Sequence, residues 1–220
     1  MDRAGLLAEL ATRIVALPDV VPRLVGVDGV DGVGKTYLAD ELAEALRSAG
    51  LTAVRVSIDG FHRPRAERYR RGRFSPEGYY RDSFDYPAFQ ASVVAPLRPG
   101  ADGAVRTAAF DVRADRPTDG DLVTVAAGDV VVVDGLFLHR PELASIWGLS
   151  VFLRAPWPVA LARMVARDGA PAPEAARRYR DGQRLYLALC GPERRASVVV
   201  DNEDVEAPRI VGGTAVSHAP

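Results

Sequence analysis

Gly29-Val-Asp-Gly-Val-Gly-Lys35-Thr36 is the stretch that decides the fold of this 220-residue chain. It matches G-x-x-x-x-G-K-[ST], the glycine-rich loop whose backbone N–H groups surround the phosphates of a nucleotide. Lys35 is the one lysine among 28 lysines and arginines, and the motif places its ammonium group on the β- and γ-phosphates. The motif also offers the Thr36 hydroxyl to Mg²⁺. We therefore predict a nucleotide-phosphate site, called the phosphate loop below, at Gly29, Val30, Asp31, Gly32, Val33, Gly34, Lys35 and Thr36.

The residues on either side of the phosphate loop fit the context that the motif requires. The run 23–28 is short and mainly apolar, as a buried strand is. The run 37–46 repeats apolar residues at helical spacing and is rich in strong helix formers. A helix that begins at the loop adds its partial positive charge where the phosphates would lie. Strand, loop and helix thus follow one another in the order that the motif needs.

Strands and helices alternate along the chain, which predicts an α/β fold with a doubly wound, mainly parallel sheet. The expected strands are 23–28, 51–58, 130–134, 149–153 and 196–200, and the expected helices are 6–17, 37–46, 88–97, 158–167 and 173–189. Residues 60–87 show no steady period, so we expect a long surface excursion there, of the kind that often carries function.

The length favours a single domain over residues 1–205. Within it we expect a hairpin insertion at about 104–125, with its turn around Pro117, Asp119 and Gly120, and a helical lid at about 168–182. Residues 206–220 have little period, and we expect a flexible C-terminal tail.

Composition restricts the class of protein. A net charge of −1 gives no general attraction to nucleic acid, and the single cysteine, Cys190, allows no intrachain disulfide. No apolar run approaches the roughly 20 residues of a membrane span, so we expect a cytoplasmic enzyme without membrane contact. A regulatory GTPase would need an N-K-x-D motif, which the sole lysine and the sole asparagine, Asn202, cannot form. The oligomeric state is open, with a homo-oligomer as one alternative.

Three acids end predicted strands at the sheet edge where ligands bind in such folds: Asp28, Asp59 and Asp134. Asp134 follows four valines, a pattern that holds Mg²⁺ directly or through water, although the residue could instead cap the next helix. Asp59 can accept the proton of an acceptor hydroxyl and orient it for in-line attack. The alternative for Asp59 is a turn-forming role before Gly60.

Several motifs continue in collinear order over roughly residues 10–205: Ser57-Ile-Asp59-Gly-Phe-His62-Arg-Pro, Phe84-Asp85-Tyr-Pro, Phe110-Asp111, Val133-Asp134-Gly135 and Leu161-Ala-Arg163-Met-Val-Ala-Arg167-Asp168. With the phosphate loop, they resemble the phosphoribulokinase/uridine kinase family of P-loop kinases, most of all the bacterial uridine kinase-like proteins. This resemblance implies the P-loop NTPase fold and an ATP- and Mg²⁺-dependent kinase.

The resemblance also implies roles for individual residues. Asp59 matches the carboxylate that activates a ribose 5′-hydroxyl, and Asp85 matches the residue that binds the sugar hydroxyls. Arg163 and Arg167 match lid arginines that approach the transferred phosphate. Two further matches are Phe110, for an aromatic residue that contacts the base, and Gln183, for a glutamine on the sugar side.

Departures from the family pattern leave the acceptor open. Gly60 follows Asp59 where the family often has Asp or Ser, and Asp115 falls near the position of a His that reads the pyrimidine. Many members carry Glu where this chain has Asp134. His62 could hydrogen-bond the substrate or be plain polar surface.

An arginine run comprises Arg63, Arg65, Arg68, Arg70, Arg71 and Arg73, with Tyr69 and Phe74 between and beside them. It could bind an anionic acceptor, an acidic partner or RNA, or it could be a solvated loop paired with nearby acids.

The sequence therefore predicts a kinase that uses ATP and Mg²⁺ to phosphorylate a small-molecule hydroxyl, the 5′-hydroxyl of uridine or cytidine in the first place. Other acceptors such as pantothenate, nicotinamide riboside or a sugar phosphate are the alternative within this class. A nucleotide-binding interaction protein without kinase activity is the alternative outside it.

Overall fold

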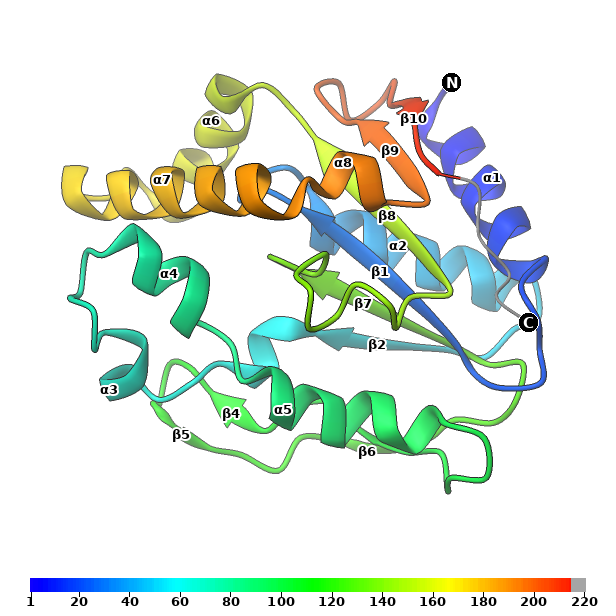
Figure 1. Cartoon of the computed structure of the whole chain (residues 1–220). Coiled ribbons are helices and arrows are strands. Elements are labelled where there is room, and N and C mark those ends of the chain that lie inside the picture. The colour runs from blue at the N-terminus through cyan, green and yellow to red at the C-terminus, as the bar shows by residue number, and fades with distance from the viewer. Residues whose placement is uncertain (215–220) are drawn as a thin grey trace.

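The computed structural model describes residues 1–214, which form a central six-stranded sheet in the order β10-β9-β8-β1-β7-β2 (Figure 1). The strands are β1 (Arg23–Gly29), β2 (Ala53–Ser57), β7 (Val130–Gly135), β8 (Leu149–Arg154), β9 (Val198–Asp201) and β10 (Arg209–Gly212). All neighbouring pairs are parallel except β9 with β10. This architecture confirms the predicted α/β fold with its mainly parallel sheet.

Both faces of the sheet are buried because successive side chains of a strand point to opposite faces. Val130 and Val132 join a core beneath α1 (Arg3–Val15) and α2 (Lys35–Ser48), whereas Val131 and Val133 join a core on the other face. The second core is closed by α7 (Pro173–Cys190), α8 (Pro192–Arg195) and the segment between β2 and β7. The sheet is therefore doubly wound, as the valine runs predict.

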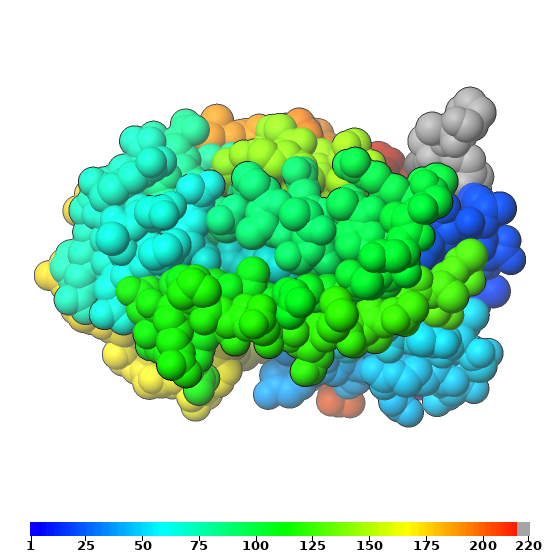
Figure 2. Space-filling model, turned by 90° about the horizontal axis from the view of Figure 1, so that it is seen from below, coloured from blue at the N-terminus to red at the C-terminus, as the bar shows by residue number. Residues whose placement is uncertain are grey.

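The segment after β2 is not the surface excursion that we expected. It forms η1 (Ile58–Phe61), α3 (Arg65–Arg68), α4 (Pro76–Asp82) and α5 (Tyr86–Phe89), which continues as η2 (Gln90–Val94) and η3 (Ala95–Leu97). Six of its aromatic side chains are buried in the core: Phe61, Tyr79, Tyr80, Phe84, Tyr86 and Phe89. No short helix contributes more than two of them, so the sequence shows no period. Figure 2 shows this layer, cyan to green, covering the middle of one face of the molecule.

The hairpin insertion is present, but its turn lies elsewhere. β3 (Ala104–Arg106) pairs with β6 (Leu122–Thr124), and further out β4 (Phe110–Asp111) pairs with β5 (Arg116–Pro117). The tip is residues 112–115, where Asp115 has a φ of 54°. The expected turn at Pro117 is wrong because Pro117 pairs with Phe110.

The C-terminal region and the lid also differ from the expectation. Residues 209–212 form β10 against β9, and Ile210 packs on the core beneath α1 and α2, so this part of the expected flexible tail is a strand. Residues 215–220 lie outside the described part. Most of the expected lid, 168–182, is the first half of α7, and only residues 169–172 connect it to α6 (Trp157–Asp168). No helix within residues 1–214 is long and apolar enough to cross a bilayer.

Candidate active site

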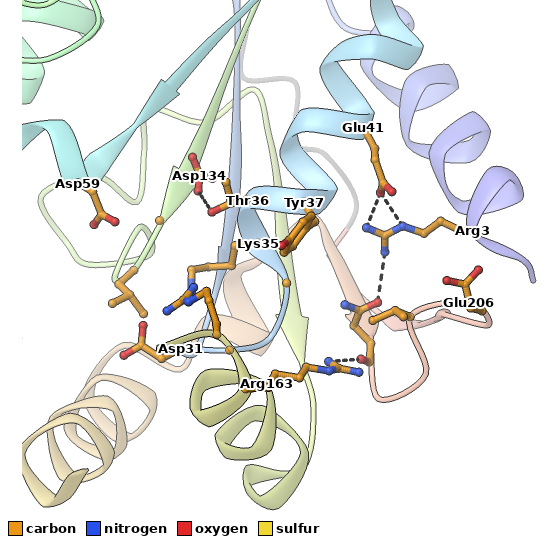
Figure 3. A pocket seen from close by; sticks show the side chains of 18 residues that line it. Arg3, Asp31, Lys35, Thr36, Tyr37, Glu41, Asp59, Asp134, Arg163 and Glu206 are labelled. Carbon is orange, nitrogen blue, oxygen red and sulfur yellow. Dashed lines mark hydrogen bonds and ion pairs between the residues drawn. The ribbon is translucent and has the colours of Figure 1, made fainter. Parts of the chain in front are cut away.

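A cavity of about 660 Å³ lies at the carboxyl ends of β1, β2 and β7 (Figure 3). Its lining includes most of the phosphate loop, Asp59 and Asp134, and Arg163 and Arg167 from α6. Parallel pairing sets Ser57 of β2 beside Asp134 of β7, so the strands end at one level. Six acidic and basic groups predicted for the site therefore line one cavity: Asp31, Lys35, Asp59, Asp134, Arg163 and Arg167.

The phosphate loop is held in shape by its neighbours. Gly32 has a φ of 74°, and a Cβ there would lie 2.1 Å from the Ala160 carbonyl oxygen, so only glycine fits against α6. Asp31 Oδ2 accepts hydrogen bonds from the Tyr79 hydroxyl (2.9 Å) and from Gln183 Nε2 (3.1 Å). Lys35 Nζ donates to the Val30 carbonyl oxygen across the loop (2.8 Å). The loop is thus closed around its lysine at the N-terminus of α2.

The Thr36 hydroxyl donates to Asp134 Oδ2 at 2.7 Å, and the Asp134 side chain is only 3% exposed. Asp134 Oδ1 forms an ion pair with Arg55 Nη2 at 2.9 Å, and Arg55 also bonds Asp40. Hydroxyl and carboxylate oxygens are ligands that Mg²⁺ prefers, and Mg²⁺ often binds one or two protein groups plus phosphates and water. The described residues hold no cluster of three or more His, Cys, Asp or Glu side chains suited to a metal. This pair therefore fits a Mg²⁺ that a nucleotide brings with it.

Asp59 lies in η1, directly after β2, and its exposed side chain faces the cavity (Figure 3). Desolvation by the surrounding protein raises its pKa, and positive charge from His62 and Lys35 opposes that rise. His62 Nδ1 donates to the Asp59 carbonyl oxygen (2.9 Å), and its ring packs on Phe84. A carboxylate with a raised pKa is suited to accept a proton.

No protein-family model matches this chain. The sequence is 27% identical to a uridine kinase from Saccharomyces cerevisiae over 157 residues, which are 69% of this chain and 30% of the yeast protein. The structure is similar to that of a candidate uridine kinase from Bacillus stearothermophilus, with a TM-score of 0.72 and 23% identity over 89% of this chain and 97% of the other. It is also similar to that of a candidate fructose transport system kinase from Silicibacter sp. TM1040. Here the TM-score is 0.68 and the identity 28%, over 86% of this chain and 95% of the other.

The chain is thus similar in sequence to uridine kinases, and its fold is that of the uridine kinase-like P-loop kinases. The proteins that it resembles include kinases named for different acceptors, so the similarity does not name an acceptor for this chain.

The two predicted lid arginines both reach the cavity. Arg163 donates to the carbonyl oxygens of Asn202 (3.0 Å) and Glu203 (2.7 Å), which fixes its guanidinium. Arg167 forms an ion pair with Asp168 (2.7 Å), and both side chains are exposed.

Four residues predicted for substrate binding lie outside the lining of this cavity: His62, described above, and Asp85, Phe110 and Gln183. Asp85 caps α5, where its Oδ1 accepts from the Ala88 N–H (3.0 Å), and Phe110 is buried in β4. Gln183 was expected on the sugar side, but its amide bonds Asp31 through both its nitrogen and its oxygen. Its observed contacts position the phosphate loop.

Asp28 does not lie at the ligand edge either. The side chain is fully buried, where it accepts hydrogen bonds from the Tyr186 hydroxyl and from His139 Nδ1 (2.6 Å). This acid joins β1 to α7 and the loop after β7.

No motif predicts the far end of the cavity, which is lined by Arg3, Tyr37, Glu41 and Glu206. Arg3 bonds Glu41 (2.6 Å) and Asn202 Oδ1 (3.2 Å). In Figure 3, Asp59 lies on one side of Lys35, and Arg3, Glu41 and Glu206 lie on the other. The cavity thus extends from the phosphate loop away from Asp59.

Proposed function

We propose that the protein transfers the γ-phosphoryl group of ATP to a hydroxyl group of a small molecule. One observation carries the proposal: the Asp59 carboxylate opens into the same cavity as Lys35 and the Thr36–Asp134 pair. Nucleotide binding alone needs no acid there, whereas a kinase uses a carboxylate beside the γ-phosphate to orient the attacking hydroxyl.

The nucleotide would lie with its phosphates on the backbone N–H groups of the phosphate loop and its base toward Arg3 and Glu206. Lys35 would exchange its contact with the Val30 carbonyl for the β- and γ-phosphates. Thr36 and Asp134 would hold Mg²⁺, which supplies positive charge to the phosphate oxygens.

Asp59 would accept the proton of the acceptor hydroxyl as the hydroxyl oxygen bonds to the γ-phosphorus. The bond from that phosphorus to the β-phosphate oxygen breaks, and ADP leaves. Arg163 and Arg167 would stabilise the negative charge on the moving phosphoryl group. Residues 1–205 would act as one kinase domain, with closure around 168–182 excluding water.

Uridine or cytidine, phosphorylated at the 5′-hydroxyl, is the acceptor that the similarity to uridine kinases favours. His62, Asp85 and Phe110 would then face the sugar and base. Pantothenate, nicotinamide riboside and sugar phosphates are the other acceptors that the same chemistry can serve.

ADP release from Mg-ATP, measured with each of these acceptors, tests the proposal. We expect one acceptor class to stimulate release and the Asp59→Asn variant to lose the stimulation. The matched control is Asp119→Asn on the hairpin, because the Asp119 side chain is 94% exposed. A nucleotide-binding interaction protein would instead hydrolyse ATP slowly, whatever acceptor or Asp59 variant is used.

A further inference from the structure

Four arginines among residues 1–214 are buried, and one differs from the rest in having no polar partner. Arg23 and Arg68 donate to backbone carbonyl oxygens, and Arg68 and Arg140 form ion pairs with acids. Arg178, only 7% exposed, has no hydrogen-bond or ion-pair partner among residues 1–214, and its Nε is fully enclosed. An unpaired buried charge is costly, so the arginine needs an explanation.

Three tyrosines surround the Arg178 guanidinium. Its central carbon lies 5.3 Å from the ring of Tyr69, 4.9 Å from that of Tyr79 and 5.6 Å from that of Tyr179. Such rings attract a cation, but they accept hydrogen bonds from its N–H groups only weakly. The tyrosines therefore hold the guanidinium in place and leave its N–H donors without partners.

Arg178 lies on the acceptor side of the proposed transfer. Helices α7 and α4 pack side by side (Figure 1). Arg178 of α7 contacts Tyr79 of α4 and Tyr69, which directly follows α3. Tyr79 connects it to Asp31 of the phosphate loop. Burial lowers the pKa of His62, and the nearby charges of Arg68 and Arg178 lower it further. His62 in turn contacts the backbone of Asp59.

Several acids of this region are paired with the arginine run. Within that run, Arg63 bonds Glu67, Arg68 bonds Asp115, and Arg70 and Arg71 both bond Asp82. Most of the run is therefore a paired loop, whereas Arg178 on α7 forms no ion pair with any acid among residues 1–214. An oxyanion that binds from outside would supply the missing partner.

We propose that Arg178 binds an oxyanion on the acceptor, so that the substrate is a hydroxyl compound that also carries a phosphate or a carboxylate. The inference rests on the proposed phosphoryl transfer and selects the anionic acceptors among those proposed above. A guanidinium held by aromatic rings presents a planar set of donors that fits a phosphate or carboxylate.

Matched pairs of acceptors test this charge directly: pantothenate and pantothenol, glycerate and glycerol, ribose 5-phosphate and ribose. We expect ADP release with the anionic member of one pair and little with its neutral partner. The carboxylate and phosphate pairs distinguish the two sources of the oxyanion. Arg178→Met should raise the KM for that acceptor about tenfold to a hundredfold and leave the KM for ATP unchanged.

Arg177→Met is the control, because Arg177 is the neighbouring residue on α7 and its side chain is 77% exposed. Arg178→Lys keeps the positive charge but lacks the planar set of N–H donors, so it should bind the acceptor more tightly than Arg178→Met and less tightly than wild type. Calorimetry gives a readout that needs no turnover. It measures the binding of inorganic phosphate to protein that is saturated with Mg²⁺ and a non-hydrolysable ATP analogue. Wild type and Arg177→Met should bind phosphate, and Arg178→Met should bind at least tenfold more weakly.

If the protein phosphorylates only uridine or cytidine, and Arg178→Met does so as well as wild type, the proposal of an anionic acceptor is overturned but the proposed kinase activity stands. Equal affinity of wild type and Arg178→Met for inorganic phosphate would also overturn the proposed oxyanion site at Arg178. ATP hydrolysis that no acceptor stimulates and that Asp59→Asn leaves unchanged would overturn the phosphoryl transfer itself.

Discussion

Replacing Arg55 with methionine should lower the free energy of unfolding by about 2 kcal/mol, because the buried Asp134 carboxylate then loses its cation. The two groups are 2.9 Å apart, and their side chains are 19% and 3% exposed. Two unit charges about 4 Å apart gain about 4 kcal/mol at an effective dielectric constant of about 20. Taking both groups from water offsets about half of that gain, since Arg55 keeps some contact with solvent.

Urea unfolding of wild type, Arg55→Met, Asp134→Asn and the double variant measures this coupling. We expect a coupling energy of about 1.5–2.5 kcal/mol. Arg13→Met is the control, because Arg13 pairs with Glu9 on the exposed side of α1 and should cost less than about 0.5 kcal/mol. Additive effects of the two substitutions would refute the reasoning and remove Arg55 from the support of Asp134.

Two further predictions concern groups around the phosphate loop. Asp59→Asn should raise the melting temperature at pH 8, and this gain should shrink toward pH 4. Because folding raises the pKa of Asp59, ionisation of its carboxyl group destabilises the folded state as the pH rises. Below the pKa of the unfolded chain, Asp59 is protonated in both states and the effect disappears. A gain that is the same at all pH values would contradict this. Tyr79→Phe removes one hydrogen bond to Asp31, worth about 1 kcal/mol, and should raise the KM for ATP about fivefold in steady-state assays. Tyr80→Phe is its matched control, since Tyr80 is the neighbouring residue on α4 and its hydroxyl contacts Cys190 and not the phosphate loop; an equal effect there would argue against the Asp31 contact.

The sheet and the phosphate loop are predictable from the sequence because their signals are local. The valine runs of β7 and β9 and the glycines before Lys35 specify strand and loop without reference to the rest of the chain. Asp59 and Asp134 follow from the rule that ligands bind beyond the carboxyl ends of parallel strands.

What the sequence does not reveal depends on contacts between distant residues. β10 is a strand because it pairs with β9, and its own residues show no period. Asp28 looks like Asp134 at the end of an apolar run, but α7 covers it and brings Tyr186 to its carboxylate. Arg178 is one of several arginines in a helical sequence, and only the packing of α4 and α3 buries it among tyrosines.

Transfer of ³²P from γ-labelled ATP is the measurement that tests the central claim most directly. Label should appear on the hydroxyl compound that stimulates ADP release, in equal amount to the ADP formed, and Asp59→Asn should abolish this product while Mg-ATP still binds. Label found only as inorganic phosphate, in wild type and variant alike, would contradict phosphoryl transfer through Asp59.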